Sequence, residues 1–462
     1  GGLGRIMAHW ILNGKPDVDV TGFNANRMQA FQANPEYRRE RVTEMLGSVY
    51  KCHYPTKAPE TARGAKRSAL HDRLAAAGAY FTDVSGWEGA SWYAPSPDLA
   101  TVDKLSFGRM NWWPYWQAEH RACREAVTLT DMSFMAKFMV QGRDAGKVLD
   151  YISANKVNGN TGQITYSQWL NDEGRIEADL TVTKLDDDKF MVVVTDTMHG
   201  HAESWMRSNI PDDAHAFVTD VTSGLTQINI QGPGSRDLLQ ALTSVDLSHE
   251  AFPFRAARDI DIGLARALCV RITYVGELGY ELYIPCEQAV HVYDRLVAEG
   301  KSHGLVHAGL SALGSLRLEK AYRDYGHDID NTDNPFDTGL GFVVSLDKPG
   351  SFIGQKAAKA QKLKAPYTRG LVQVLVGDPE PLLWHGEVIL RDGQMVGDVR
   401  AGSYGHTLGG AVGLAMIESG ETPVTADYLA TGTWEIEIAG KRYPCTCSLR
   451  ALYDPEMRRI LR

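Results

Sequence analysis

The sequence predicts an α+β fold of about three domains, and three observations support that prediction. The 462 residues are 44% apolar and 23% charged and include ten tryptophans, a composition typical of folded rather than disordered chains. Between about residues 140 and 345, short strand patterns alternate with helix patterns. From about residue 353 onward, closely spaced turn signals such as Asp392-Gly393 and Gly409-Gly410 indicate a small barrel or sandwich.

The expected domains are residues 1–100, 101–345 and 346–462. Apolar residues at helical spacing follow the glycines at the start of the chain, over residues 5–12. Residues 13 to about 100 are polar and rich in helix breakers, with a short helix pattern over 70–77 that Gly78 can end. The proline-rich stretch 91–97 is interpreted as a linker into the second domain.

The second domain is expected to contain short, mixed elements. Apolar alternation predicts strands at residues 137–140, 164–170, 176–184, 190–195, 226–231 and 268–274. Helical spacing predicts helices at 119–127, 235–242, 288–299 and 312–322.

Charge and motif content exclude several function classes. Forty-eight basic against 57 acidic residues give a net charge of −9, which disfavours nucleic acid as the main partner. No apolar run reaches the roughly 18 residues that a membrane span needs. The six cysteines are too few for a disulfide framework, so a reducing compartment, bacterial cytoplasm or mitochondrial matrix, is expected. His199-Gly200-His201 lacks further ligands at metal-site spacing, so no metal is predicted.

Carboxylates on glycine-punctuated strands are the candidate chemical groups. After a turn at residues 171–174, Glu177, Asp179 and Thr181 alternate with apolar residues and so share one strand face. A carboxylate as deep in an apolar strand as Asp179 needs a partner, and a functional role and a structural salt bridge both remain open. Glu281, which re-enters a strand after a glycine turn, is either solvated or functional. Arg317 and Glu319, near a helix end, have the same two interpretations.

The chain resembles a known family from about residue 105 to residue 460. The motifs that carry this resemblance are Asp131-Met132-Ser133-Phe134-Met135, Tyr166, residues 170–182, Gln231-Gly232-Pro233, residues 274–281, 317–328 and 400–409. Together they look like the aminomethyltransferase, or T-protein, of the glycine cleavage system. The resemblance implies a folate-binding domain of mixed sheets and helices followed by a C-terminal β-barrel.

Residues 1–100 narrow this resemblance to the dimethylglycine and sarcosine dehydrogenases. Gly1-Gly2-Leu3-Gly4-Arg5, residues 37–41, His53-Tyr54-Pro55 and Gly86-Trp87-Glu88 are similar to the end of their FAD-dependent oxidoreductase domain. The chain is therefore expected to be the C-terminal portion of a longer protein, with FAD held mainly by a preceding region or a separate flavin subunit. Gly1, Gly2 and Gly4 are candidate flavin contacts, because glycines that open a helix let backbone amides approach a cofactor.

The resemblance also implies roles for individual residues. Glu281 matches the carboxylate that pairs with the amino-pyrimidinone edge of tetrahydrofolate, whose two parallel donors suit two acceptors. Asp179 matches the catalytic carboxylate beside the reacting folate nitrogens, where it could accept a proton and stabilise a cationic iminium. The remaining implied folate contacts are Met135, Tyr166, Thr181, Thr195, Tyr274, Arg317 and Tyr325. Arg317 is left open as a ligand contact or a structural partner, and Glu119 and His120 are expected to stabilise the fold.

Two positions depart from the family pattern. Thr195 stands where T-proteins commonly have asparagine, which puts that ligand contact in doubt. Ala178-Asp179 replaces a double aspartate, so the catalytic role depends on one carboxylate.

The resemblance implies oxidative demethylation of an N-methylated amine, dimethylglycine-like or sarcosine-like, with the one-carbon unit passing to tetrahydrofolate as 5,10-methylenetetrahydrofolate. This chain would carry the folate-dependent half, with a small amine as substrate, no nucleic-acid or membrane partner, and a homo-oligomer left open. Two alternatives remain, a folate-dependent demethylase of an O- or S-methyl substrate and a non-catalytic folate-binding protein.

Overall fold

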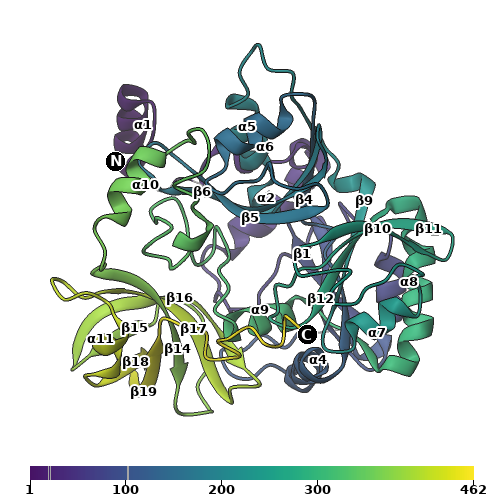
Figure 1. Ribbon diagram of the computed structural model, residues 1–462. Coiled ribbons are helices and arrows are strands. Elements are labelled where there is room, and N and C mark those ends of the chain that lie inside the picture. The colour runs from purple at the N-terminus through teal and green to yellow at the C-terminus, as the bar shows by residue number, and fades with distance from the viewer. Residues whose placement is uncertain (19, 21, 101–102) are drawn as a thin grey trace.

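The computed structural model describes residues 1–18, 20, 22–100 and 103–462, and these residues form two open sheets, a closed barrel and an N-terminal segment (Figure 1). The mixed α+β architecture with a C-terminal barrel confirms the fold class that the sequence predicts. In the described part of the chain, no helix is long and apolar enough to cross a membrane.

The N-terminal segment contains two exposed helices and a β-hairpin. Helix α1 (Gly2–Asn13) confirms the helical spacing, and its apolar side chains Ile11 and Leu12 are exposed to solvent. Helix α2 (Pro35–Ser48), which sequence reasoning missed, begins where the Asn34 side chain accepts hydrogen bonds from two backbone N–H groups.

The stretch interpreted as a linker begins instead as a strand. After helix α3 (His71–Ala76), strand β1 (Ala79–Val84) pairs with β2 (Trp87–Tyr93), so residues 91–93 are not linker. Trp92 is only 1% exposed, because it stacks on Tyr80 and Trp112 in an aromatic cluster. The prolines that follow lie just beyond the end of the strand.

One open sheet has six strands and is covered by helices α7 (Ser235–Gln240) and α8 (Cys286–Gly300). Its strand order is β10 (Ala257–Ile262), β11 (Ala265–Val270), β12 (Gly279–Pro285), β9 (Leu225–Gln231), β3 (Val127–Asp131), β13 (Leu305–His307). The predicted strand 268–274 lies too far along the sequence, because β11 ends at Val270. A turn follows, in which the Thr273 hydroxyl accepts from the amides of Val275 and Gly276.

The other open sheet has five strands, with helices α5 (Ala145–Ile152) and α6 (His199–Ser208) packed against it. Its order is β5 (Gln163–Leu170), β6 (Ile176–Asp186), β7 (Lys189–Val194), β4 (Ala136–Gln141), β8 (Phe217–Asp220). The pairing of β5 with β6 sets Tyr166 opposite Thr181 and Gln168 opposite Asp179.

The two open sheets face each other across a small apolar cluster. Met191 and Val193 of β7 pack there with Val270 of β11 and Tyr283 of β12. Because Val193 pairs with Thr181, and Thr181 and Asp179 share a face of β6, Asp179 lies on the side of its sheet that faces the other sheet.

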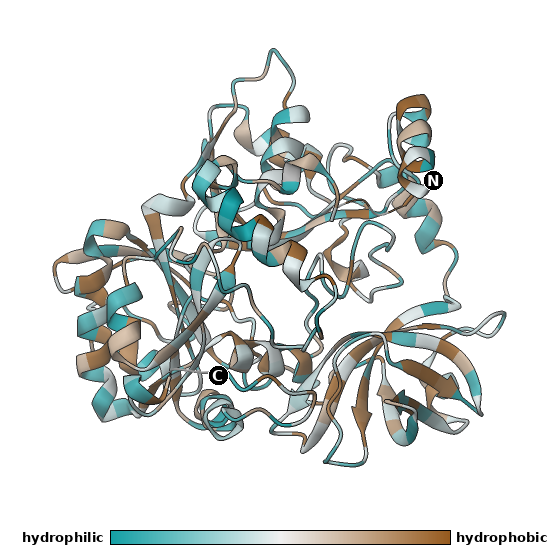
Figure 2. Cartoon of the chain, turned by 180° about the vertical axis from the view of Figure 1, so that it is seen from behind, coloured by the Kyte–Doolittle hydropathy of each residue, from teal (hydrophilic) through white to brown (hydrophobic). Residues whose placement is uncertain are grey.

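The C-terminal barrel closes in the order β14-β17-β16-β15-β18-β19 around a hydrophobic core of its own. Stretches of its strands are brown, that is hydrophobic, in Figure 2. Its strands are β14 (Arg369–Val376), β15 (Val388–Arg391), β16 (Gln394–Gly405), β17 (Gly410–Glu418), β18 (Trp434–Ile438) and β19 (Lys441–Ser448). The barrel begins at Arg369 rather than near residue 353, because helix α10 (Gln355–Lys362) precedes it. A short helix, α11 (Ala426–Ala430), lies between β17 and β18.

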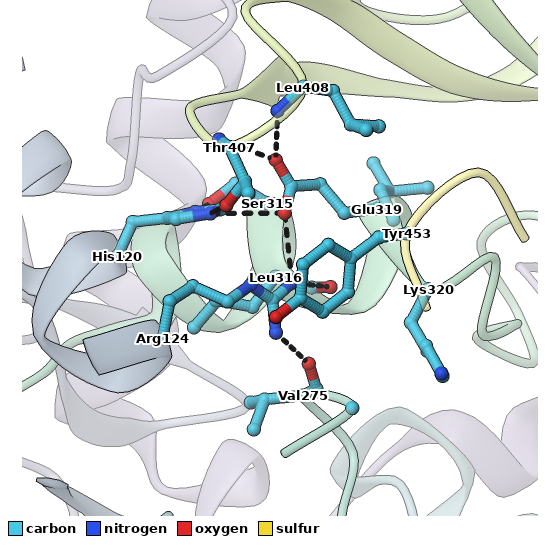
Figure 3. A network of polar contacts seen from close by, with 12 residues as sticks. His120, Arg124, Val275, Ser315, Leu316, Glu319, Lys320, Thr407, Leu408 and Tyr453 are labelled. Carbon is cyan, nitrogen blue, oxygen red and sulfur yellow. Dashed lines mark hydrogen bonds and ion pairs between the residues drawn. The ribbon is translucent and has the colours of Figure 1, made fainter. Parts of the chain in front are cut away.

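A buried ionic network ties the barrel to helices α4 (Trp113–Glu125) and α9 (Leu310–Glu319) (Figure 3). The Glu319 carboxylate accepts from the backbone amides of Thr407 and Leu408, at 2.8 and 3.1 Å, in the turn between β16 and β17. It also accepts from Arg124 (2.9 Å) and pairs with His120 (3.2 Å). Burial alone would raise the pKa of Glu319, but the two basic partners outweigh it and lower that pKa to about 2.

Helix α9 is shorter than the predicted 312–322. It ends at Glu319 because Ala321 adopts a positive φ of 55°, which a helix cannot continue. Glu119 of α4, expected to stabilise the fold, accepts from the backbone amides of Tyr93 (2.6 Å) and Gly309 (2.8 Å) and so joins strand β2 to the start of α9.

Candidate functional site

Asp179 lies at the centre of a small hydrogen-bond cluster on β5 and β6. The Tyr166 hydroxyl donates to both of its carboxylate oxygens, at 2.8 and 2.9 Å, and the Gln168 amide donates to Oδ1 at 3.0 Å. Tyr166 and Gln168 alternate along β5, and Asp179 is paired with Gln168, so register alone brings the three side chains to one face. Among the described residues, no basic side chain forms a salt bridge with Asp179. A structural salt bridge therefore does not explain why this carboxylate lies in an apolar strand.

The surroundings of Asp179 favour its neutral form. Burial raises the pKa of Asp179 to about 7, against the lowering effect of the hydrogen bonds from Tyr166 and Gln168. Asp324, just after helix α9, raises it further, and burial also raises the pKa of Asp324, to about 6. A carboxyl group with a pKa near neutrality can both accept and release a proton, as general acid–base chemistry requires.

Glu281 occupies the equivalent place on the six-stranded sheet. The Tyr283 hydroxyl donates to its Oε2 at 2.6 Å, and the Asn229 amide donates to Oε1 at 3.4 Å. Asn229 is the direct cross-strand partner of Glu281, and Tyr283 lies two residues further along the same face of β12. Burial raises the pKa of Glu281, and these two hydrogen bonds oppose the rise.

The two carboxylates are held in the same way on facing sheets. Each accepts from one tyrosine hydroxyl and one side-chain amide, and neither has a cationic partner in direct contact among the described residues. Each neighbourhood also contains a buried amide oxygen that no donor in the described part of the chain reaches, Gln168 Oε1 beside Asp179 and Gln227 Oε1 beside Asn229. The region between the sheets therefore offers carboxylate and carbonyl acceptors, which suit a ligand rich in N–H donors.

Four of the other predicted folate contacts lie around these groups. Thr181 shares the face of Asp179, and Met135 packs on the apolar cluster between the sheets. The Tyr274 hydroxyl donates to the Arg323 carbonyl at 2.6 Å. Burial, with a smaller contribution from the charge of Asp179, raises the pKa of Tyr274, and the positive charge of Arg323 acts to lower the pKa of Asp179. Thr195 follows β7 directly, and its hydroxyl donates to Asp196 at 3.4 Å.

Arg317 and Tyr325 are engaged within the protein core. The Arg317 guanidinium forms a buried ion pair with Asp328 at 2.7 Å and donates to the Tyr322 carbonyl, which favours the structural alternative for this residue. The Tyr325 hydroxyl donates to the Ile176 carbonyl at 3.0 Å, and its ring belongs to the core behind the five-stranded sheet. Among the described residues, Arg317 forms its ion pair with Asp328 and not with Asp179 or Glu281.

The candidate flavin contacts are separate from this site. Gly1, Gly2 and Gly4 are exposed at the start of helix α1, near the edge of the molecule (Figure 1). Their role remains a prediction.

Sequence reasoning missed the side chains that orient the carboxylates, namely Gln168, Gln227, Asn229 and Tyr283. One signal could have found two of them. Gln227, Asn229 and Gln231 alternate with apolar residues along β9, yet all three are at most 3% exposed. A buried polar face on an interior strand indicates a network or a ligand.

Comparison with known protein families gives three matches along the chain. Residues 70–348 match the GCVT N-terminal domain, and residues 369–454 match the glycine cleavage T-protein C-terminal barrel domain. Residues 13–68 match the FAD dependent oxidoreductase central domain.

Curated proteins are similar to nearly the whole chain. The chain is 39% identical over 459 residues to 4-methylaminobutanoate oxidase (formaldehyde-forming) of Paenarthrobacter nicotinovorans, covering 99% of this chain and 54% of that protein. It is 31% identical over 499 residues to mitochondrial sarcosine dehydrogenase of Homo sapiens, covering 100% of this chain and 54% of that protein. The chain thus spans about half the length of these relatives.

A solved structure shows the same fold. The glycine cleavage system aminomethyltransferase T from Bartonella henselae superposes with a TM-score of 0.69 at 22% identity, covering 83% of this chain and 96% of that one.

Proposed function

The chain belongs to the glycine cleavage T-protein family, as it occurs in the dimethylglycine and sarcosine dehydrogenases, and on that premise we propose that it binds tetrahydrofolate between its two open sheets. There it transfers to the folate a one-carbon unit taken from an N-methylated amine, which gives 5,10-methylenetetrahydrofolate. The observation that carries this proposal is the pair of half-buried carboxylates, Asp179 and Glu281, each held by neutral donors on facing sheets.

Glu281 is the residue that holds the pterin. Its two oxygens match the N–H and amino donors of the amino-pyrimidinone edge, and each oxygen has lone pairs to spare beyond the Tyr283 and Asn229 hydrogen bonds. Because Glu281 is half-buried, a ligand donor there replaces less solvent than at an exposed carboxylate, which strengthens a charge-assisted hydrogen bond. Gln168 Oε1 and Gln227 Oε1, which accept from no donor among the described residues, are further acceptors for the same ligand.

Asp179 is the residue that moves the proton. With its pKa raised to about 7, it can accept the proton that a folate nitrogen loses on forming a bond to carbon, and return it to solvent. Tyr166 and Gln168 orient the carboxylate, while its negative charge stabilises positive charge that develops on the one-carbon unit.

The amine-oxidising step belongs to the flavin-dependent part of this architecture. Bound FAD would accept one hydride, which carries two electrons, from the N-methyl carbon, leaving an iminium. Residues 13–68 resemble one domain of such an oxidoreductase, and the names of the relatives point to sarcosine, dimethylglycine or 4-methylaminobutanoate as the class of substrate. The co-substrate, the flavin partner and the particular amine are all part of the proposal.

Equilibrium binding to the purified chain tests the folate assignment. We expect tetrahydrofolate to bind and the Asp179→Ala variant to fold and bind it with little change.

In a second step, the chain is combined with a flavin-dependent oxidoreductase and each of the three amines, and methylenetetrahydrofolate and free formaldehyde are measured. Asp179→Ala should shift the product towards free formaldehyde. Unchanged folate product in a folded variant refutes the assignment, and methyltetrahydrofolate as product favours the O- or S-methyl alternative.

A further inference from the structure

A chain of hydrogen bonds leads from Glu281 to an amide oxygen without a donor. Asn229 donates its Nδ2 to Glu281 Oε1 at 3.4 Å, and Gln227 donates its Nε2 to Asn229 Oδ1 at 3.2 Å. Gln227 Oε1 then has no hydrogen-bond partner in the described part of the chain, although the residue is only 2% exposed.

The direction of these hydrogen bonds follows from the Glu281 carboxylate, the acceptor at their end. An ionised carboxylate only accepts, so Asn229 must present its NH₂ group to Glu281 and its oxygen to Gln227. Gln227 must then present its own NH₂ group, which leaves its oxygen unpaired. Turning over the Gln227 amide would set two oxygens against each other, so the unpaired acceptor is a consequence of the arrangement and not of one rotamer choice.

Gln227 is also held in place and faces the proposed ligand region. Its backbone N–H donates to the Ser133 hydroxyl at 3.2 Å, and its carbonyl accepts from the Met132 amide at 2.9 Å. In the register of β9 with β12, Gln227 is opposite Tyr283 and Asn229 is opposite Glu281, so all four share the face that meets the five-stranded sheet.

We propose that Gln227 determines the redox specificity of the folate site: its Oε1 accepts a hydrogen bond from a ring N–H that only the reduced pterin has. This inference rests on the proposed function. The amino-pyrimidinone edge is the same in folic acid and tetrahydrofolate, so Glu281 cannot distinguish them. The ring nitrogens N5 and N8 differ, because they carry hydrogens in tetrahydrofolate and bare lone pairs in folic acid. An acceptor fixed opposite one of them attracts the first ligand and repels the second.

The test compares dissociation constants for tetrahydrofolate and folic acid in the wild-type chain and in Gln227→Met. Methionine keeps the length of the side chain and removes its strong acceptor. We expect tetrahydrofolate binding to weaken about tenfold and folic acid binding to stay equal or tighten, so that the preference for the reduced ligand falls by at least about tenfold. Tyr283→Phe is the matched control: it removes a donor to Glu281 and should weaken both ligands by the same factor.

A second measurement needs no variant. The wild-type chain is titrated with 5-deaza- and 8-deazatetrahydrofolate, in each of which carbon replaces one ring N–H. One analogue should bind about tenfold more weakly than tetrahydrofolate, and Gln227→Met should show no such difference. Equal affinity for both analogues and tetrahydrofolate, or an unchanged preference in a folded Gln227→Met variant, overturns the role of Gln227 and leaves the folate site intact. A wild-type chain that binds neither folate overturns the proposed function and this inference together.

Discussion

Replacing Asp179 with asparagine should remove activity and increase stability, and the second effect should depend on pH. Asparagine keeps the shape of the side chain but cannot take up a proton. Its amide can still accept from the Tyr166 hydroxyl, and its NH₂ group can donate to Gln168 Oε1, which has no donor in the described part of the wild-type chain, if the Gln168 amide turns over. The hydrogen-bond cluster can therefore be satisfied without the charge.

The size of the stability effect follows from the raised pKa. Folding moves the pKa of Asp179 from 3.8 to about 7, so between about pH 4 and pH 7 the folded chain holds a proton that the unfolded chain has released. The free energy of unfolding of the wild type therefore falls as pH rises through this window, and the loss is complete above about pH 7. At about 1.4 kcal/mol per pKa unit the full cost is about 4 kcal/mol, which the partial exposure of Asp179 reduces to about 2 kcal/mol.

Denaturant unfolding of both proteins at pH 4.5 and pH 8 measures this effect. We expect the variant to match the wild type near pH 4.5 and to exceed it by about 2 kcal/mol at pH 8, while the rate of one-carbon transfer falls by about 10² to 10⁴. Asp172→Asn, an exposed carboxylate in the turn before the same strand, is the control and should show neither effect. A stability difference that is the same at both pH values, or a variant that retains its transfer rate, refutes the reasoning.

Three further substitutions test other parts of the structure. Glu281→Gln should weaken tetrahydrofolate binding at least about tenfold by equilibrium titration, because the new NH₂ group faces ligand donors; unchanged affinity would contradict the assigned pairing. Glu319→Gln should cost at least about 1–3 kcal/mol of unfolding free energy, because it removes one of the two carboxylates that pair with buried Arg124 and turns an NH₂ group towards donors that a carboxylate accepts from. Glu203→Gln, in an exposed pair on helix α6, should cost less than about 0.5 kcal/mol, and similar losses in the two variants would contradict the network. Gly397→Ala should cost at least about 1–3 kcal/mol of unfolding free energy, since its Cβ would lie 1.9 Å from a carbonyl oxygen of the neighbouring strand β17. Gly224→Ala, whose Cβ would have no atom of the described residues within 4 Å, is the control, and equal stability of the two variants would contradict the close approach.

Local patterns were sufficient to predict the strands that carry the site, but not the partners of the carboxylates. The alternation around Asp179 correctly predicts a strand from residue 176, and the glycine turn before Glu281 correctly places that residue in β12. The hairpin that joins Asp179 to Tyr166 spans 13 residues, a separation that turn signals can bridge. Asn229 and Glu281 are 52 residues apart, and their pairing depends on a strand order that no local signal specifies.

Where the predicted secondary structure was wrong, packing in the folded chain and not local composition determines the structure. Residues 91–93 precede two prolines and therefore resemble a linker, yet Trp92 is buried by aromatic stacking and extends the strand. Helix α9 stops three residues early because Ala321 takes a left-handed conformation that apolar spacing does not reveal. Tertiary contacts decide both outcomes.

The buried carboxylates of this chain differ in what surrounds them, and that difference separates structural from functional groups better than burial does. Glu319 has two basic partners and two backbone donors, so its pKa is lowered to about 2 and it stays charged. Burial raises the pKa of Glu119 to about 8, but each of its oxygens already accepts from a fixed backbone amide and the residue is only 2% exposed. Asp179 also has a raised pKa, yet it keeps partial exposure and lies beside an amide oxygen that no described donor satisfies. A raised pKa indicates a reacting group only where the neighbouring polar atoms are left for a ligand to complete, and of these three carboxylates Asp179 alone meets that condition.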